Sequence, residues 1–394
     1  MRILAAFDKC KDSLSADDLC SLAEERIKSR VPEVTVRKIP QTDGGEGFAS
    51  ILTRSGSGEM RTVRVLDSLG RSREIEVGLL DAASLSQEVR DFLCLGDSGR
   101  IVLIEMASIV GLADLQPRER NPWETCTFGV GECLRESLNW NISAILLGIG
   151  GSSTNDMGVG ALGALGVRFL DGDGRDLGFP SPSQWGFIKT IDRSTLINLP
   201  PVKIACDVNN PLLGKNGATW QFGLQKGLKT EDQEQLEEKM VSMAALLKDS
   251  FAECNGSENL PGMGAAGGIG FGLSLASEVS MVGGFSLVSK WFELEREISD
   301  SDLVLSGEGR FDRTSLQGKG PCEILRLGAK HQKRGILLAG SVEKEAALRF
   351  RQENPLIEVH AFGRQDLSLE ENLLRSEELF LAKLDEVMME FYSC

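Results

Sequence analysis

Short apolar runs that end in glycine or a charged residue alternate with segments of helical spacing along much of this chain of 394 residues. Two such runs lie near the start and three near the end, each followed by a segment with helical periodicity. Five buried strands that alternate with helices are typical of a flavodoxin-like doubly wound parallel sheet. The predicted strands cover residues 3–7, 34–39, 303–305, 335–339 and 356–361.

The long middle segment has a different pattern. Residues 63–65 and 75–77 alternate with polar positions, as antiparallel or edge strands with one solvated face do. Buried strands are predicted at residues 100–106, 142–147 and 202–205, with helices between them. We therefore predict an α/β protein in which a second α/β domain is inserted into the flavodoxin-like domain. The predicted boundaries give residues 1–58 plus 290–394 for the discontinuous flavodoxin-like domain and residues 59–289 for the inserted domain.

Charge and cysteine usage narrow the class of protein. The 43 Lys and Arg residues are outnumbered by 58 Asp and Glu, which gives a net charge of -15. This balance disfavours nucleic acid or an anionic membrane as the main partner. The nine cysteines show neither metal-site spacing nor a C-x-x-C motif, and no apolar run is long enough to span a membrane. We expect a soluble protein of the reducing cytoplasm.

Several common kinds of catalytic site are disfavoured. The chain has two histidines, His331 and His360, in segments that predict structural roles, which argues against a Ser-His-Asp hydrolase or a His-ligated zinc enzyme. The P-loop pattern fails because Gly320 follows Lys319. A G-x-G-x-x-G pattern at residues 262–267 follows a polar loop instead of a strand, so it does not predict a dinucleotide fold. Those glycines are expected to let backbone approach another backbone or a ligand closely.

The stretch at residues 303–321 carries the side chains that phosphate and metal sites use. Its apolar run is predicted to stop at Ser306, and the glycine-rich loop that follows contains carboxylates, arginine and lysine. Taken alone, such a stretch could be a solvated surface loop. These side chains are Glu308, Arg310, Asp312 and Lys319.

Carboxylates that follow predicted strands recur in the chain. Any one of them could cap a helix, but five together favour a site for Mg²⁺ and phosphate, because carboxylates hold Mg²⁺ and glycine-rich turns bind phosphate through N–H groups. Lys11, Lys226, Arg310 and Lys319 could neutralise a transferred group. This set of side chains favours phosphoryl transfer, which depends on positioning and electrostatics. The five carboxylates are Asp8, Asp43, Asp156, Asp207 and Glu308.

Ordered blocks along nearly the whole chain resemble those of the bacterial type I glycerate kinases. The chain departs from the residues that are common in that family at Cys10, where an aromatic is usual, and at Asp12 and Met157, where glycine is frequent. The matching blocks are residues 8–15, 43–47, 119–122 with Gly129 and Gly131, 148–156, 206–214, 222–227, 264–268 and 307–319.

The resemblance implies ATP-dependent phosphorylation of D-glycerate, usually at the 2-hydroxyl, by a flavodoxin-like domain with an inserted second domain. We expect ATP and Mg²⁺ as cofactors, Asp207 as the base or orienter of the attacking hydroxyl, and Asp43 and Asp207 as metal ligands. Lys11 and Arg310 are expected to contact phosphate or the glycerate carboxylate. The residues expected to bind the nucleotide are Gly150, Gly151, Ser152, Thr154, Asn155, Glu308, Asp312 and Lys319.

Two alternatives stay open at this point. A kinase for another small hydroxy acid or sugar acid would differ only in its pocket residues. A non-catalytic module that binds a metabolite belongs to a different class, and the many carboxylates beside glycine turns argue against it.

Overall fold

The structure is a computed structural model that describes residues 1–251 and 257–393. The chain forms two compact units, one made of Met1–Asp43 and Phe285–Cys394 and the other of Gly44–Gly284. We call them the flavodoxin-like unit and the inserted unit. These boundaries differ from the predicted ones, which were after residues 58 and 289.

The helix that follows the first boundary explains most of this difference. Helix α2 (Phe48–Ser55) packs on strands β3, β4 and β5 of the inserted unit. A Cβ added at Gly78 of β4 would lie 1.7 Å from the Thr53 hydroxyl oxygen of α2, so the absent side chain lets the helix lie directly on the sheet. Thr53 is fully buried there. The sequence pattern predicted the helix correctly but not the sheet that it covers.

The flavodoxin-like unit contains a five-stranded sheet with the order β13-β12-β11-β1-β2, and all of its pairings are parallel. Numbered by their sequence order within the unit, the strands run 2-1-3-4-5, which is the flavodoxin order. The two strands near the start and three near the end are therefore confirmed. The strands are β1 (Arg2–Phe7), β2 (Thr35–Lys38), β11 (Leu303–Phe311), β12 (Arg334–Val342) and β13 (Ile357–Ala361).

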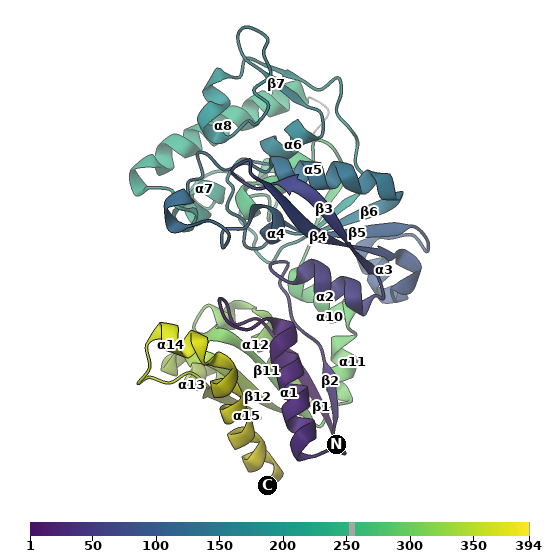
Figure 1. Ribbon diagram of the computed structural model, residues 1–394, viewed down its shortest axis with the longest axis vertical. Helices are drawn as coiled ribbons and strands as arrows, with labels where there is room; N and C mark the ends of the chain where they lie inside the picture. The colour runs from purple at the N-terminus through teal and green to yellow at the C-terminus, as the bar shows by residue number, and fades with distance from the viewer. Residues whose placement is uncertain (252–256, 394) are drawn as a thin grey trace. The chain divides into compact units, whose positions relative to one another are not determined.

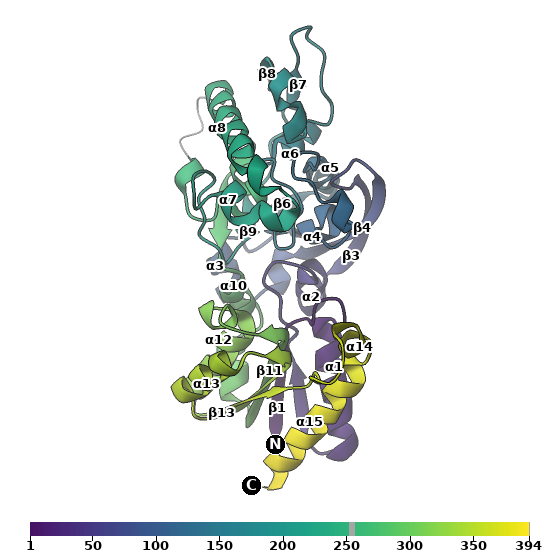
Figure 2. The ribbon, with the colours of Figure 1, turned by 90° about the vertical axis from the view of Figure 1, so that its left-hand side faces the viewer.

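Helices cover both faces of this sheet. Helices α1 and α15 contact one another and share an apolar core with β1, β11 and β12, and Figure 1 shows them side by side. Helices α12 and α13 lie on the opposite side of the sheet, as Figure 2 shows. The helices of this unit are α1 (Ala16–Arg30), α10 (Gly284–Trp291, which begins at the last residue of the inserted unit), α11 (Leu294–Ser299), α12 (Gly320–Lys330), α13 (Lys344–Glu353), α14 (Leu369–Leu374) and α15 (Ser376–Ser393).

The inserted unit contains a six-stranded mixed sheet with the order β10-β9-β6-β5-β4-β3. Its first four strands are parallel, and the β5–β4 and β4–β3 pairs are antiparallel, as the alternating pattern of residues 63–65 and 75–77 predicted. The six strands are β3 (Glu59–Leu66), β4 (Ser72–Asp81), β5 (Arg100–Glu105), β6 (Ile142–Gly148), β9 (Val202–Ala205) and β10 (Val279–Val282), and a separate hairpin pairs β7 (Arg168–Leu170) with β8 (Thr190–Asp192).

One large apolar core joins this sheet to its helices. Met240 and Met243 of α8 are buried in it, as expected for core-filling methionines. Besides α2, the α-helices of the inserted unit are α3 (Gln87–Leu93), α4 (Met106–Val110), α5 (Phe128–Ser137), α6 (Val159–Ala164), α7 (Ala218–Phe222), α8 (Gln233–Ser250) and α9 (Ile269–Leu273).

Strand β11 differs from its prediction. It was expected to end at Ser306, but it continues through the glycines and charges to Phe311. Beyond the end of β1, it remains paired with β12, with Glu308 opposite Ala339 and Arg310 opposite Ser341. Gly307 permits this because a Cβ there would lie 1.8 Å from the Leu338 carbonyl oxygen. Glu308 and Arg310 therefore stand on a strand, where their backbone is fixed by pairing.

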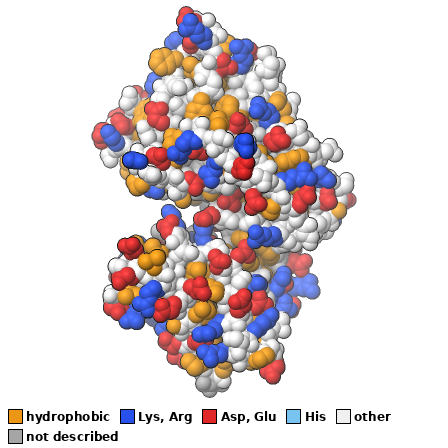
Figure 3. All heavy atoms as spheres, viewed as in Figure 1, with side chains coloured by type: hydrophobic (Ala, Val, Ile, Leu, Met, Phe, Trp, Pro, Cys, Tyr) orange, Lys and Arg blue, Asp and Glu red, His pale blue; other side chains and the backbone are white. Residues whose placement is uncertain are grey.

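None of the described helices combines the length and apolar character that crossing a membrane requires. On the face drawn in Figure 3, Lys and Arg side chains are interspersed with Asp and Glu, without an extended basic area.

Candidate active site

A pocket of about 760 Å³ lies in the flavodoxin-like unit, at the carboxyl ends of β1, β11, β12 and β13. In open α/β sheets, ligands bind beyond the carboxyl ends of the strands, where the strand order reverses. The reversal in this sheet lies between β1 and β11, and the loop that follows β1 and the end of β11 both contribute to the pocket. Its position is therefore the one expected for the ligand site of a flavodoxin-like fold.

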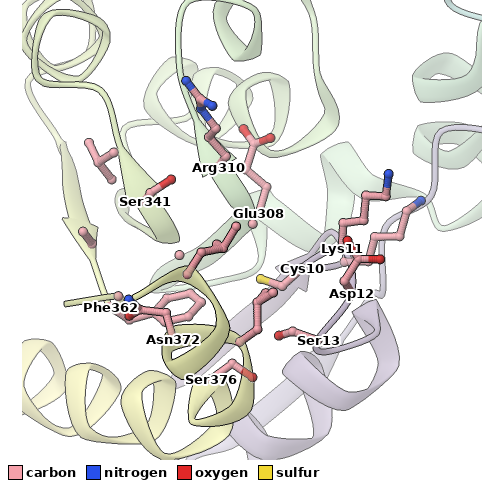
Figure 4. Close-up of a pocket in the computed structure, with 18 of the residues that line it drawn as sticks. Cys10, Lys11, Asp12, Ser13, Glu308, Arg310, Ser341, Phe362, Asn372 and Ser376 are labelled. Atoms are coloured by element: carbon pink, nitrogen blue, oxygen red, sulfur yellow. The ribbon is translucent and has the colours of Figure 1, made fainter. Parts of the chain in front are cut away.

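Five of the residues predicted for the site line this pocket. They come from three places in the sequence, namely the loop after β1, the residue before the inserted unit, and β11 with the loop that follows. Figure 4 shows Glu308 and Arg310 in the upper part of the pocket and Lys11 to the right. The five are Lys11, Asp43, Glu308, Arg310 and Lys319.

Glu308 and Lys319 form an ion pair, with Lys319 Nζ 2.9 Å from Glu308 Oε2. The Glu308 side chain is only 6% exposed, and burial raises the pKa of its carboxyl group although Ser315 and Lys319 act in the opposite direction. Burial alone would lower the pKa of Lys319, but the negative charge of Glu308 and its hydrogen bond raise it on balance. Lys319 is therefore a cation at neutral pH.

The second carboxylate oxygen of Glu308, Oε1, is buried and has no hydrogen-bond partner among the described residues. A buried acceptor without a partner is costly, and in native structures such atoms often mark a place for a ligand or an ion. Because Glu308 lines the pocket, a group bound there would lie near this oxygen.

Asp8, one of the five carboxylates noted in the sequence but given no individual role there, also lines the pocket. Burial raises the pKa of its carboxyl group to about 6, and the negative charges of Asp43 and Glu308 act in the same direction. Lys9 opposes them through its charge and through its backbone N–H, which donates to Asp8 Oδ1 at 2.8 Å. Four carboxylates, those of Asp8, Asp12, Asp43 and Glu308, and several cations thus share one pocket.

Asp312 has a more local role than predicted. Its Oδ1 accepts hydrogen bonds from the backbone N–H and the hydroxyl of Thr314, and these bonds lower the pKa of its carboxyl group. Its Oδ2 lies 3.1 Å from Nε of Arg310. Asp312 therefore orders the loop after β11 and holds Arg310, and it is not among the residues that line the pocket.

The opposite part of the pocket was not predicted from the sequence. It is formed by Phe362 after β13, by Leu369 and Leu373 of α14, and by Ser341 at the end of β12. These residue types occur in any core or loop, so they carry no chemical signal in the sequence. Cys10 also lines the pocket, and burial raises the pKa of its thiol to about 12, so it is not a nucleophile at neutral pH.

The predicted turn at residues 150–155 belongs to the inserted unit. The N–H of Gly150 donates to the Gly44 carbonyl oxygen at 3.0 Å, so this donor is already engaged by the turn before α2. Leu112 N–H donates to the carbonyl oxygen of Gly151. The glycines of this turn thus hold backbone segments together at the carboxyl end of β6.

The hydroxyl and amide side chains of the same turn are buried. Ser152, Thr154 and Asn155 are at most 6% exposed. Beneath them, Lys226 Nζ donates to Ser152 Oγ at 3.1 Å and to the Thr154 carbonyl oxygen at 2.6 Å. Burial lowers the pKa of Lys226 to about 7. Thr154 Oγ1 and Asn155 Oδ1 are buried without a hydrogen-bond partner among the described residues, so the nucleotide contacts expected of this turn stay a prediction.

The glycine pattern at residues 262–267 supports this buried turn. A Cβ at Gly267 would lie 2.1 Å from the Thr154 carbonyl oxygen, and one at Gly264 would lie 2.0 Å from the Pro211 carbonyl oxygen. The pattern therefore serves close approach of one backbone to another, which is one of the two roles expected for it.

Two further carboxylates of the inserted unit have defined partners. Asp156 is buried and accepts hydrogen bonds from the N–H and hydroxyl of Thr127 at 2.8 Å and from the N–H of Gly160 at 3.1 Å, so it is structural. Asp207, just beyond β9, is exposed, and its Oδ1 accepts a 2.7 Å hydrogen bond from Gly284 N–H at the start of α10. Asp207 and Asp43, the two predicted metal ligands, belong to different units.

The described residues contain no group of three or more His, Cys, Asp or Glu side chains placed to hold a metal ion. This finding does not conflict with Mg²⁺, because protein sites for Mg²⁺ often use one or two carboxylates together with substrate phosphates and water.

Comparisons with known proteins agree with these features. Residues 3–392 match the model of the glycerate kinase family. The chain is 34% identical over 349 residues to a glycerate kinase of Haemophilus influenzae, with 88% of this chain and 87% of that protein covered. It is 32% identical over 354 residues to a glycerate 2-kinase of Escherichia coli K12, with 88% and 87% covered.

A solved structure is similar over the whole length. A crystal structure described as glycerate kinase 2 from Salmonella typhimurium LT2 superposes with a TM-score of 0.76 at 31% identity. The similarity covers 100% of this chain and 98% of the other.

Proposed function

The chain belongs to the glycerate kinase family, and from that premise we propose that it transfers the γ-phosphoryl group of ATP to the 2-hydroxyl of D-glycerate. The observation that carries this proposal is the family match over residues 3–392, which includes both units. The pocket of the flavodoxin-like unit supports it, because its cations and carboxylates suit phosphate groups and a divalent ion.

In the proposed reaction, the 2-hydroxyl oxygen of glycerate attacks the γ-phosphorus of ATP. A bond forms between these atoms, the bond from the γ-phosphorus to the bridging oxygen breaks, and ADP leaves with the electron pair. The hydroxyl proton passes to a base, for which we propose Asp207. Lys11 and Arg310 are proposed to neutralise phosphate oxygens or the glycerate carboxylate, where the guanidinium group of arginine offers two parallel donors.

The carboxylates of the pocket fit a role beside Mg²⁺. Asp8, Asp43 and Glu308 supply oxygen donors, and the buried Glu308 Oε1 has no partner among the described residues. We propose Asp43 as a metal ligand in the flavodoxin-like unit and Asp207 as one in the inserted unit. When bound, Mg²⁺ neutralises charge on the phosphate oxygens. Glu308 is proposed to hold Lys319 in place for the same phosphates.

The direct test is an assay of ADP release with D-glycerate, ATP and Mg²⁺, and we expect turnover that depends on all three. The same assay with a panel of other hydroxy acids and sugar acids tests the alternative substrates, for which D-glycerate is expected to give the highest kcat/KM. An enzyme with no turnover of D-glycerate contradicts the proposal.

The role of Asp207 can be tested by the Asp207→Asn substitution. An asparagine keeps an oxygen for the Gly284 N–H, so the fold should be retained, but it cannot take the proton. We expect kcat to fall by about 10²–10⁴-fold, the usual loss for a general base. Asp249→Asn, at an exposed position of the same unit, serves as the control. A kcat close to that of the wild type in Asp207→Asn would remove this residue as the base.

A further inference from the structure

The pocket of the flavodoxin-like unit has two chemically different halves. One half carries the charged groups of the loop after β1 and of β11. The other half is lined by the apolar side chains of Phe362, Leu369 and Leu373. In Figure 4, Glu308 and Arg310 lie in the upper part of the view, and Phe362 and Asn372 lie in the lower part. The charged half holds carboxylates and cations in equal number, so a ligand that fills the whole pocket needs a charged end, such as phosphates that carry Mg²⁺, and an apolar end.

The apolar half is rigid before any ligand binds. The ring of Phe362 makes an edge-to-face contact with Phe380, at 5.7 Å between centroids, and Phe380 makes a second one with Phe7 of β1 at 5.4 Å. Phe362 is thus anchored to the core of the sheet. Because the ring of Phe362 is already held in place, it loses little conformational entropy when a flat group packs on it.

The loop that leads to α14 is held by Asn372. Its Oδ1 accepts from Arg364 N–H at 2.8 Å, and its Nδ2 donates to the carbonyl oxygens of Arg364, Leu367 and Ser368 at 3.0–3.2 Å. Ser368 and Glu371 add a capping box at the start of α14. Leu369 therefore stands at a fixed place on the pocket while 76% of its surface is exposed.

We infer that this pocket is the nucleotide site, with the base of ATP against Phe362, Leu369 and Leu373 and the phosphates towards Lys11, Arg310 and Lys319. The inference rests on the proposed function and assigns one of its two substrates to one unit. A pocket of about 760 Å³ with an apolar half suits a nucleoside triphosphate. D-glycerate is a three-carbon acid with almost no apolar surface, so it would leave the apolar half uncovered.

The test compares two leucines of the same short helix. Leu369 lines the pocket, whereas Leu374 is 80% exposed and does not. Leu369→Asn and Leu374→Asn each replace an exposed leucine by a polar side chain of similar size, so neither should disturb folding. Calorimetry with MgADP and, separately, with magnesium pyrophosphate measures binding without requiring turnover.

For Leu369→Asn, we expect the Kd of MgADP to rise about tenfold, the effect of losing one apolar contact with the base, and the Kd of pyrophosphate to stay within about twofold. Leu374→Asn is expected to leave the Kd of MgADP and the Kd of pyrophosphate within about twofold of the wild-type values. In the assay, Leu369→Asn should raise the KM for ATP and leave the KM for D-glycerate unchanged.

Three results would overturn the inference. They are an unchanged Kd of MgADP in Leu369→Asn, an equal loss in Leu374→Asn, and a raised KM for D-glycerate in place of ATP. Failure of the proposed function looks different. Suppose that the wild type binds MgADP, that Leu369→Asn weakens this binding, and that the wild type does not phosphorylate glycerate. This result would contradict the proposed function and support the nucleotide site.

Discussion

The ionised carboxyl group of Asp8 lowers the stability of the folded protein, because it is buried near other negative charges. The folded-state pKa of its carboxyl group is about 6, above its ordinary value of 3.8, because of burial and the nearby charges of Asp43 and Glu308. The folded protein therefore binds this proton more tightly than the unfolded chain does. The stability that comes from the neutral carboxyl group is fully present below about pH 4 and is lost as the pH rises through about 6.

Asp8→Asn is neutral at every pH and keeps an oxygen for the Lys9 N–H. We expect it to raise the free energy of unfolding by about 1–3 kcal/mol at about pH 8 and to change it little at about pH 4. Urea denaturation at the two pH values measures this difference. A free energy of unfolding that falls equally at both would show that Asp8 stabilises the fold and would contradict the account.

Asp12 and Met157 are the two positions where this chain has another residue in place of the glycine that is frequent in the family, and both have a left-handed backbone, with φ of 63° and 53°. Glycine adopts this conformation without strain. The resemblance to the family therefore located two unusual backbone positions that no periodicity could reveal.

The same substitution should have opposite effects at these two positions. Asp12 is exposed, so Asp12→Gly should raise the free energy of unfolding by about 0.5 kcal/mol through relief of backbone strain. Met157 is fully buried, so Met157→Gly should lower it by about 2–5 kcal/mol, since lost packing outweighs the relief. Urea denaturation of both variants checks the signs, and a stabilised Met157→Gly would contradict this comparison.

At the scale of elements, β11 is the strand that builds the charged half of the pocket. Its extension past β1 places Glu308 and Arg310 on paired backbone, and Gly307 is the residue that allows it. The first three residues of β11 could be predicted from the sequence because they are apolar. The rest of the strand was missed because its glycines and charged residues resemble the sequence of a loop.

Gly307→Ala should therefore be strongly destabilising. Its Cβ would lie 1.8 Å from a carbonyl oxygen of the paired strand β12, so the two strands would have to separate locally. We expect the free energy of unfolding to fall by about 2–4 kcal/mol. Gly328→Ala in α12 is the matched control, because the atom nearest to the added Cβ would be 3.6 Å away. We expect this substitution to raise the free energy of unfolding by about 0.5–1 kcal/mol. Similar stability of the two variants, measured by urea denaturation, would contradict the role given to Gly307.

Other elements were predictable to different degrees for physical reasons. Strands β1, β6 and β9 are continuous apolar runs with buried side chains, and their predicted positions agree closely with the structure. Strand β10 was missed, because its four residues are half-buried and include a serine. The start of helix α1 is fixed by a capping box, in which Ser15 Oγ accepts from Asp18 N–H and the Asp18 carboxylate accepts from Ser15 N–H.

At the scale of the whole molecule, the two-domain α/β organisation followed from counting strands, and the family followed from ordered motifs. The charged half of the pocket could be predicted because carboxylates and cations that recur just after buried strands are typical of ligand sites in α/β proteins. The apolar half could not, because Phe362, Leu369 and Leu373 come to line one pocket only through the strand order that brings the ends of β12 and β13 and helix α14 beside β1. The domain boundaries were misplaced since sequence periodicity does not show which sheet a helix covers.

The central claim is tested most directly by identifying the product that the full chain makes from D-glycerate, ATP and Mg²⁺. Phosphorus–proton coupling in the NMR spectrum of the product shows which carbon carries the phosphate. We predict coupling to the single proton on C2, as in 2-phosphoglycerate, with one ADP formed per product. Coupling to the two protons on C3 would contradict the proposed hydroxyl, and the absence of any phosphoester would contradict the proposed function.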